Sequence, residues 1–250
     1  MDDLVKRAMA RWPSVPAVHG WLRLGRRGTW FLIDRNAPGF DPVRDSGGSP
    51  ITSPPIIDFI QRNYEADDDG NWYFQNGPQR VFVTLDHAPL IFRVTGEGDA
   101  RALAAHTGRP VGAIREARFD RQGNLFLQTD VGPGMVDDRD LVRLVADEET
   151  ADEDAADRDA AQGHAAQGHV AEGNVAEGGA AEGKAGTDPN GSAGGGDVLR
   201  LSLPRYGFAI EWREADADQA LPVETIATRF GYQRRPEAPA GAVPPSPPVD

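Results

Sequence analysis

The 250-residue sequence contains no cysteine and only two lysines, Lys6 and Lys184. The absence of cysteine excludes disulfides, zinc sites built from thiolates and cysteine nucleophiles. Nucleic-acid binding needs clustered lysine and arginine to displace counterions from phosphates, so the scarcity of lysine argues against a nucleic-acid partner. The sequence also lacks an apolar run of about 18 residues, and its first residues contain no apolar signal segment. We therefore expect a soluble, cytoplasmic protein without a membrane partner.

Glycine and proline are abundant, with 29 and 20 residues against a hydrophobic content of 39%. This composition is richer in helix and strand breakers than that of an ordinary globular domain, so part of the chain is expected not to be globular. The charge is equally uneven. Residues 147–197 contain 13 acidic and two basic residues and so carry −11 of the net charge of −13.

The acidic stretch includes five copies of a five-residue unit, AAQGH AAQGH VAEGN VAEGG AAEGK, between Ala160 and Lys184. Such a segment has almost no apolar surface to offset about 1–2 kcal/mol of backbone entropy per residue. We predict that residues 146–196 form a disordered acidic pentapeptide-repeat insert and that the proline-rich residues 237–250 form a tail.

The first part of the chain predicts two helices and a β-hairpin. Asp2 and Asp3 are suited to cap a short helix over residues 4–10. Residues 21–24 and 29–34 alternate around a Gly-Arg-Arg-Gly turn, which is typical of a hairpin. Ser53 is a good N-cap and is followed by proline and by apolar residues at helical spacing, which predicts a second helix.

The remainder reads as strands separated by tight turns, with one more helix. We expect a meander over 72–75, 80–85 and 90–95, and a second group of strands over 103–106, 114–119, 124–129 and 134–136. Beyond the insert, two strands meet at Pro204, and a helix over 223–230 ends at Gly231.

These elements predict an α+β fold made of two small β-rich modules. Residues 1–96 form the first, with a hairpin, a helix and a meander sheet. Residues 97–145 and 197–236 form the second, which is mostly antiparallel. Segments 69–83 and 122–136 match at an offset of 53 residues, sharing Gly-Asn and a glutamine. Common ancestry and two independent strand-turn-strand units both account for that match.

The segments ARWPSVPAVHGWL, GSPITSPPIIDFIQRNY, DDDGNWYFQNGPQRVFVTLDHAPLIF, MVDDRDLVRL and RFGYQRRP resemble a family of small proteobacterial proteins known only as a domain of unknown function. The layout is also similar to that of another uncharacterised proteobacterial family, with a hairpin, a helix and a D-G-x-[WY] meander before a second β-rich module. The resemblance covers about Trp12–Val145 and Val198–Pro236. It implies a two-module α+β fold and no known activity.

Two acidic motifs were weighed as sites. EADDDGNWYFQN fits the first half of a calcium-binding loop, but position 12 is Asn76 and no exiting helix follows, so we interpret it as an Asp-rich turn. VDDRDL places Asp137, Asp138 and Asp140 close enough for paired-carboxylate chemistry. The same residues suit the N-terminus of a helix over 141–145, and we favour that cap.

No pattern in the sequence predicts a catalytic residue, a metal or a cofactor. His19, His87 and His106 lie in separate turns or strands. His164 and His169 belong to the repeat, where a chance histidine is favoured over a weak metal site. GEGDA and GPG lack the spacing and the following helix of a phosphate-binding loop.

One candidate ligand site surrounds the Asn76-Gly77-Pro78 corner. Tyr73, Gln75 and Asn76 could line a groove in which Arg80 binds a carboxylate or phosphate. Arg62 could lie nearby, although a surface pair with Asp67 or Asp69 is favoured for it. The alternative for the aromatic residues is burial beneath the helix that follows Ser53.

These features favour a soluble, non-enzymatic binding or adaptor protein for a small anionic ligand or a peptide, of unknown oligomeric state. The first alternative is a hydrolase or transferase that assembles Asp86, His87 and Asp137 in the fold, and it requires displaced pKa values in a concave pocket. The second is a structural subunit of a larger assembly, which requires a large exposed apolar patch.

Overall fold

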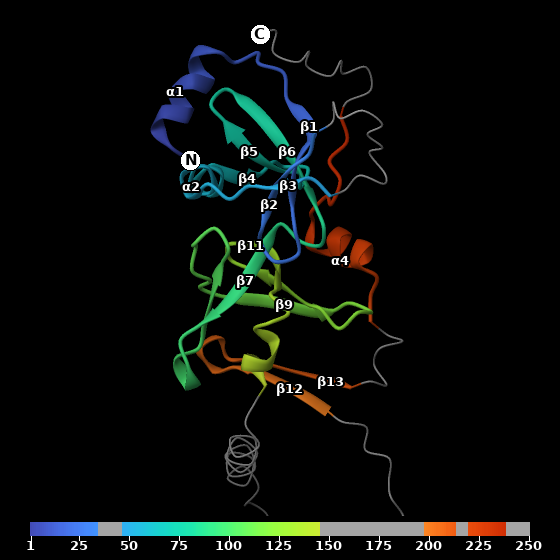
Figure 1. The fold of residues 1–250 in the computed structure, drawn as a ribbon. Coiled ribbons are helices and arrows are strands. Elements are labelled where there is room, and N and C mark those ends of the chain that lie inside the picture. Colours follow the sequence, from blue (N-terminus) through green and yellow to red (C-terminus); the bar gives the residue numbers. More distant parts are fainter. Residues whose placement is uncertain (35–46, 146–197, 214–219, 239–250) are drawn as a thin grey trace, which may run out of the picture.

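The computed structural model describes residues 1–34, 47–145, 198–213 and 220–238. These residues form two β-sheets, one above the other in the view of Figure 1, together with a two-stranded hairpin and three α-helices. The predicted insert at 146–196 and most of the predicted tail lie outside the described residues. None of the helices that the structure describes has the length and apolar character needed to span a membrane.

The first sheet contains β1 (Val18–Leu24), β2 (Trp30–Leu32), β3 (Ser49–Pro50), β4 (Tyr64–Ala66), β5 (Trp72–Asn76) and β6 (Gln79–Leu85). The second contains β7 (Leu90–Thr95), β8 (Ala102–Ala105), β9 (Ile114–Phe119), β10 (Leu125–Thr129) and β11 (Gly132–Val136). The hairpin consists of β12 (Val198–Leu203) and β13 (Phe208–Arg213). The α-helices are α1 (Asp3–Arg11), α2 (Pro54–Arg62) and α4 (Val223–Phe230). Three 3₁₀ turns complete the described elements: η1 (Gly98–Ala100), η2 (Leu141–Leu144) and η3 (Pro204–Tyr206). The α+β class predicted from the sequence is confirmed.

The first sheet has the order β3-β2-β1-β6-β5-β4. The predicted hairpin is confirmed, because β1 and β2 pair antiparallel and the alternating Leu22 and Leu24 are both buried. The predicted second helix is α2, which follows Ser53 with proline at its first position. It packs on the sheet through Phe59, whose ring meets that of Phe74 edge to face at 5.4 Å. The expected burial of this aromatic under the helix is confirmed.

β7 does not belong to the first sheet, so its predicted place in the meander is wrong. It pairs in parallel with β11 and antiparallel with β8, inside the order β8-β7-β11-β10-β9. Leu90, Ile91 and Phe92 are consecutive and all have 0% exposed surface. A strand buried on both faces must lie inside a sheet, and the second sheet provides that position. The division into residues 1–96 and 97–145 with 197–236 stays a proposal.

The two sheets share one topology. Five strands of the first sheet, in the order β2-β1-β6-β5-β4, correspond to β8-β7-β11-β10-β9. In each, the second and third strands of that order are parallel and the other neighbours are antiparallel. β5 begins at residue 72 and β10 at residue 125, which is the offset of 53 found in the sequence. The sequence match therefore marks equivalent strands.

A turn with the pattern Asp-x-x-Gly-Asn precedes both β5 and β10. Asp67 accepts the backbone N–H of Asn71 at 2.8 Å and its side-chain amide at 3.2 Å. Asp120 accepts the corresponding groups of Asn124, both at 2.8 Å. The glycine of each turn has a φ of +78°. The predicted Asp-rich turn is confirmed, and it occurs twice.

The C-terminal segment contacts both sheets. α4 covers exactly the predicted residues and ends at Gly231, which has a φ of +70°. The following Gln233 donates its backbone N–H to Gly70 O at 2.9 Å, and Leu85 N of the first sheet donates to Arg234 O at 2.8 Å. On the other side, Leu221 forms a bridge with Asp120 of the second sheet. This segment therefore ties the two sheets together, and Figure 1 shows α4 beside their junction.

The β12–β13 hairpin, predicted around Pro204, lies against the second sheet. Leu201 forms a bridge with Val145. The Tyr206 hydroxyl donates to Val111 O at 3.2 Å and accepts the N–H of Leu103 at 2.8 Å. The hairpin adds buried leucines to a hydrophobic core that is continuous between the two sheets.

An aromatic seam joins the sheets. We define this seam as Trp30, Tyr64 and His106. Trp30 meets Tyr64 edge to face at 5.0 Å, and its ring centroid lies 5.6 Å from that of His106. Gln61 of α2 donates a hydrogen bond to His106 O at 2.8 Å. The helix that packs on the first sheet therefore also holds the loop that follows β8 of the second sheet.

The two Asp-x-x-Gly-Asn turns predict a difference between matched glycine variants. A Cβ on Gly70 would lie 2.3 Å from Gly231 O, whereas a Cβ on Gly123 has no atom within 4 Å. Gly123→Ala should destabilise the protein by about 1–2 kcal/mol. The added methyl group meets no neighbouring atom, so the loss comes from holding alanine in the left-handed backbone conformation alone. Gly70→Ala should add a packing clash of about 1–3 kcal/mol. Equal losses in urea unfolding of the two variants would contradict this arrangement.

Candidate functional site

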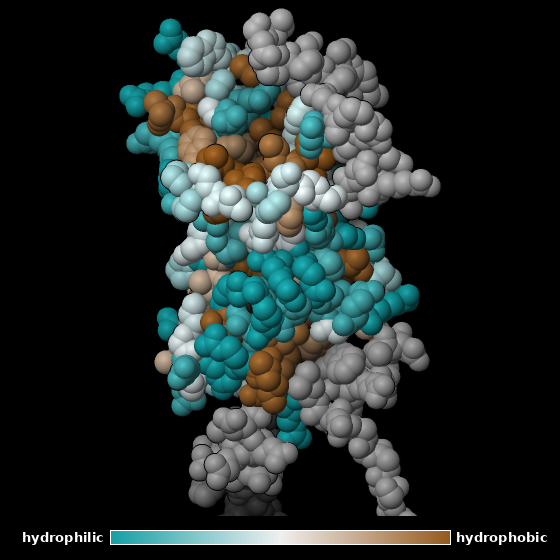
Figure 2. Space-filling view, viewed as in Figure 1, coloured by the Kyte–Doolittle hydropathy of each residue, from teal (hydrophilic) through white to brown (hydrophobic). Residues whose placement is uncertain are grey.

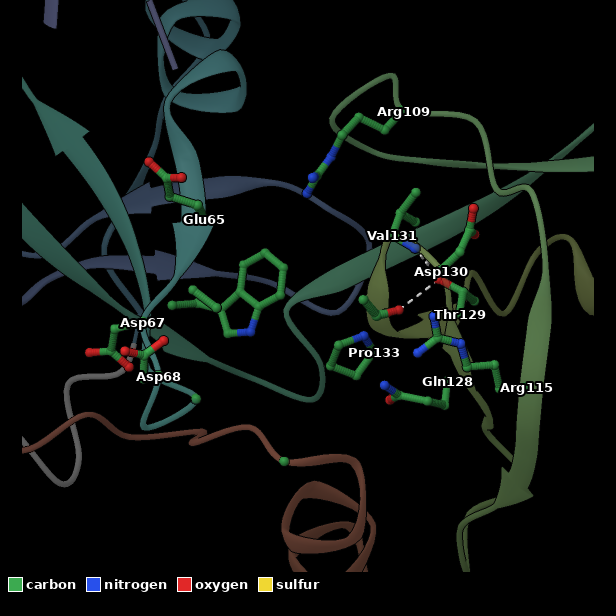
Figure 3. Close-up of a pocket in the computed structure, with 15 residues that line it drawn as sticks. Glu65, Asp67, Asp68, Arg109, Arg115, Gln128, Thr129, Asp130, Val131 and Pro133 are labelled. Carbon is green, nitrogen blue, oxygen red and sulfur yellow. Dashed lines mark hydrogen bonds between the residues drawn. The ribbon is translucent and has the colours of Figure 1, made fainter. Parts of the chain in front are cut away.

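A pocket of about 410 Å³ lies between the two sheets (Figure 3). One wall is the turn between β4 and β5, and the opposite wall comes from β9, β10 and the turn between β10 and β11. Gly231, at the end of α4, contributes a third side. The pocket thus exists because the two sheets and the C-terminal segment meet there.

The turn between β10 and β11 is held rigidly by its own hydrogen bonds. The Thr129 hydroxyl donates to Gly132 O at 2.7 Å and accepts the N–H of Val131 at 3.2 Å, as the dashed lines in Figure 3 show. The Asp130 carboxylate accepts the N–H groups of Ala113 and Gly112. These backbone hydrogen bonds lower the pKa of Asp130 and anchor its charge to the loop before β9.

Trp72 supplies an apolar surface to the pocket. Its side chain is almost fully buried, and its ring lies 4.9 Å from that of Tyr64 in the seam. A Cβ placed on Gly132 would lie 3.3 Å from the Trp72 ring. Glycine at this position lets the indole pack closely on the backbone of the second sheet.

Two arginines on the second sheet's side of the pocket have no ionic partner among the described residues. Arg109, in the loop after β8, and Arg115, on β9, are both exposed and line the pocket. Neither forms an ion pair or a side-chain hydrogen bond with the described residues. Other arginines of this unit are engaged, as Arg139 is with Asp137 at 2.8 Å. Figure 3 shows the Arg115 guanidinium directed toward Gln128 and Pro133.

Gln128 adds an unsatisfied acceptor. Its Oε1 is buried and receives no hydrogen bond within the described residues. Buried polar side-chain atoms nearly always have a partner, so this atom is suited to receive a donor from a ligand. Together with two free guanidinium groups, which bind carboxylates and phosphates through paired N–H groups, it makes the pocket a polar binding site.

The opposite wall is acidic. Asp67 is occupied by its own turn, whereas Asp68 is exposed and its carboxylate has no partner among the described residues. Glu65 also lines the pocket, but Figure 3 shows its carboxylate turned away from Pro133. The two walls therefore carry opposite free charges.

The residues predicted around Asn76 are only partly brought together. Arg80 lies over the Tyr73 ring at 4.6 Å, and Asn76 is exposed at the turn. Tyr73 is buried, and Gln75 is fully buried with its amide donating to Gly77 O at 2.9 Å. Their predicted place in an open groove is therefore wrong, because β5 is buried on both faces.

Arg62 does not join this corner. It pairs with Asp2 at 3.3 Å, so the favoured pair with Asp67 or Asp69 is wrong. The sequence could not reveal this contact, because α1 is placed beside the end of α2 only in the fold. Asn63 reinforces it by accepting the backbone N–H of Asp2 at 2.8 Å.

The pocket residues Arg109, Arg115 and Gln128 were not predicted. The sequence did contain a signal for them: the offset of 53 residues carries Gln75 onto Gln128, and the Asn76 corner onto the turn that begins at Thr129. The predicted corner is thus the first unit's equivalent of the pocket wall. Only the fold shows that the turn of the second sheet, and not the Asn76 corner of the first, faces the other sheet.

Of the three groups proposed for catalysis, Asp86 and Asp137 are engaged in ion pairs with arginines. Asp86 is paired with Arg23. Burial lowers the pKa of His87, whose ring Nδ1 is buried. Burial alone would raise the pKa of Asp137, but hydrogen bonds from Arg139 and the charge of Arg93 outweigh it and lower the pKa to about 2. A carboxylate held in this way is a poor general acid or base at neutral pH.

The acidic motif before η2 is not a helix cap. η2 is a single 3₁₀ turn, and its N-cap Asp140 makes no side-chain capping bond. Its carboxylate instead accepts the N–H of Val94 at 3.0 Å, which connects η2 to β7. The predicted cap is therefore wrong, because the carboxylates of this motif accept hydrogen bonds from the backbone of the second sheet and from its arginines.

Other surfaces offer less definite chemistry. Among the described residues, no three His, Asp or Glu side chains gather so that they could hold a metal ion. Figure 2 shows a hydrophilic band across the middle of this face, over β9, with a hydrophobic patch below it. In η2, Val142 is 73% exposed.

The model of the family described as "Protein of unknown function (DUF2946)" matches residues 1–186. None of the curated proteins matches. A DUF1285 family protein from Silicibacter pomeroyi DSS-3 is 21% identical, with a TM-score of 0.37 over 60% of this chain and 87% of that chain. A DUF1285 family protein from Shewanella baltica OS155 is 12% identical, with a TM-score of 0.34 over 49% of this chain and 87% of that chain.

Proposed function

The chain belongs to the family described as "Protein of unknown function (DUF2946)", and we propose that it is a non-enzymatic binding protein that holds a small anionic ligand in the pocket between its two sheets. The observation that supports this function is a pair of guanidinium groups, Arg109 and Arg115, that line a cavity of about 410 Å³ and have no partner within the described parts of the chain. Cavities of this size accept small molecules. We place this activity in the cytoplasm.

The polar groups of the pocket support binding more than reaction. Thr129, the one hydroxyl-bearing residue among the lining residues, is occupied within its turn, and Asp130 is held by backbone N–H groups. No lining residue is a histidine or a cysteine. The anion would lie against Arg115 and Arg109, with Gln128 accepting a hydrogen bond from the ligand and Trp72 covering its apolar part.

The Arg80 corner is a less suitable anion site. Arg80 also forms no ion pair with the residues that the structure describes, but its guanidinium lies over the Tyr73 ring at an exposed turn. Arg109 and Arg115 are exposed as well, but they line the cavity together with the unpartnered Gln128 Oε1, whereas Arg80 does not line it. We therefore assign the anionic ligand to the pocket.

A thermal-shift screen with small carboxylates and phosphates tests the proposal. A ligand at a hundred times its Kd should stabilise the protein by about 2.7 kcal/mol. Arg115→Gln and Arg109→Gln should each weaken binding by about 10- to 100-fold, because each removes hydrogen bonds to a charged group worth about 1.5–3 kcal/mol.

Arg205→Gln is the matched control, because Arg205 is an exposed arginine of η3 that does not line the pocket. It should bind every hit as the wild type does. The proposal fails if no anion stabilises the wild type, or if the hits bind the two pocket variants with unchanged affinity.

A further inference from the structure

The free charges of the pocket are separated by sign. The anionic Asp68 belongs to the turn between β4 and β5, and the cationic Arg109 and Arg115 belong to the second unit. Figure 3 shows Asp68 on one side of the pocket and Arg115 with Gln128 on the other. A ligand with only negative charge would satisfy one wall and face a repelling carboxylate at the other.

The neighbouring acidic residues Asp67 and Asp130 do not change this separation of positive and negative charge. Asp67 gives its oxygens to the N–H groups of its own turn, and Asp130 gives its oxygens to Ala113 and Gly112. Their charges are therefore compensated locally by backbone dipoles. The lining charges without a partner in the described part of the chain are Asp68 and Glu65 on the first wall and Arg109 and Arg115 on the second.

The backbone at the pocket favours an extended ligand. β4 is one of the two edge strands of the first sheet and β9 is one of the two edge strands of the second, and both contribute lining residues. Edge strands present backbone N–H and C=O groups that have no partner within the sheet, and an extended peptide can pair with them as an added strand. The buried Gln128 Oε1 requires an N–H or O–H donor, which a peptide backbone also supplies.

We propose that the pocket binds a short linear peptide of two or three residues with both termini free. Its carboxylate lies against Arg109 and Arg115, its ammonium group lies against Asp68, and its backbone runs along the strand edges. This inference rests on the proposed function and specifies its ligand. A cavity of about 410 Å³ is at the small end of the range for drug-sized ligands, which suits this peptide length.

The experiment compares three pools of random tripeptides: one with free termini, one N-acetylated and one C-amidated. The pool with free termini should raise the Tm of the full-length protein. Blocking either end should weaken binding at least about tenfold, because each block removes one charge-assisted contact. Isothermal titration with peptides isolated from the bound fraction gives the affinities.

Variants assign each terminus to its wall. Asp68→Asn should bind the free and the acetylated pools equally while still preferring a free carboxylate. Arg115→Gln should bind the free and the C-amidated pools equally while still preferring a free ammonium group. Asp99→Asn and Arg205→Gln replace exposed charges outside the pocket and should behave as the wild type. All four residues are exposed, so the unliganded Tm values should agree.

Two outcomes would overturn the inference. One is the absence of any stabilisation by the free pool, and the other is equal binding of the free and acetylated pools by the wild type. If peptides fail but a carboxylate or phosphate from the anion screen binds in an Arg115-dependent way, the peptide ligand is wrong and the proposed function stands. If both screens fail, both proposals fall.

Discussion

Replacing Trp30 with alanine is expected to lower the free energy of unfolding by about 3–5 kcal/mol, the usual loss for a large aromatic side chain in a core. Trp30 is 1% exposed and contacts both other members of the seam, Tyr64 and His106. The loss should lie near the upper end of that range, since an edge-to-face aromatic pair adds about 0.5–1.5 kcal/mol beyond burial. Urea unfolding followed by circular dichroism measures the change.

Trp12→Ala is the matched control. Trp12 is 50% exposed at the end of α1, so its removal should change the stability by no more than about 0.5 kcal/mol. A similar loss in both variants would show that the seam does not hold the two sheets together.

The second large effect is a loss of stability in mild acid caused by His106. Burial, and to a smaller extent the charge of Arg109, lowers the pKa of His106 to about 3. Its Nδ1 accepts the N–H of Ile91 at 3.2 Å, which requires the unprotonated ring nitrogen. Below a pH of about 6.5 the histidine of the unfolded chain gains a proton that the folded protein does not accept.

The unfolded state is therefore favoured as the pH falls from about 6.5 toward 3, by up to about 1.4 kcal/mol per pH unit. His106→Asn keeps an acceptor near Ile91 but removes the titrating group. Urea unfolding at pH 6.5 and pH 4.5 should show a steeper loss for the wild type than for the variant. The comparison isolates His106 from His87, whose pKa is also lowered by burial. Parallel pH profiles would contradict this account.

Local patterns in the sequence were sufficient to predict most individual elements. The alternation around the Gly-Arg-Arg-Gly turn predicts the β1–β2 hairpin, and the proline after Ser53 predicts the start of α2. The left-handed Gly231 predicts the end of α4. Each of these depends on residues that are close in the chain, where backbone preferences decide the structure.

The assignment of strands to sheets could not be predicted in the same way. β7 follows β6 after a short corner, and consecutive strands usually pair, which favoured a meander. Its parallel partner β11 begins 42 residues further along the chain, at Gly132 against Leu90, and no local pattern identifies it. The available signal was the run of three consecutive apolar residues, Leu90, Ile91 and Phe92, which are buried on both faces of the strand. Such a run indicates a strand in the interior of a sheet.

The candidate site was missed for a related reason. The sequence drew attention to one Gly-Pro corner and to Arg80, while the pocket uses the equivalent corner of the second unit. Arg109 and Arg115 stand in segments without a motif, and their lack of partners is a property of the fold. The repeated Asp-x-x-Gly-Asn turn, at residues 67–71 and 120–124, and the glutamine that follows it in both copies were the sequence features that related the two corners.

Chemical labelling of arginine tests the central claim most directly, because it does not require the ligand to be known. Phenylglyoxal should modify Arg109, Arg115 and Arg205 readily in the purified protein, as all three are exposed and form no ion pair within residues 1–34, 47–145, 198–213 and 220–238. Peptide mass spectrometry with and without the dialysable small molecules of a cell extract gives the protection of each residue. We predict that the extract protects Arg109 and Arg115 while Arg205 reacts as before. Equal reaction of all three arginines in the presence and absence of the extract would contradict a ligand-binding pocket between the two sheets.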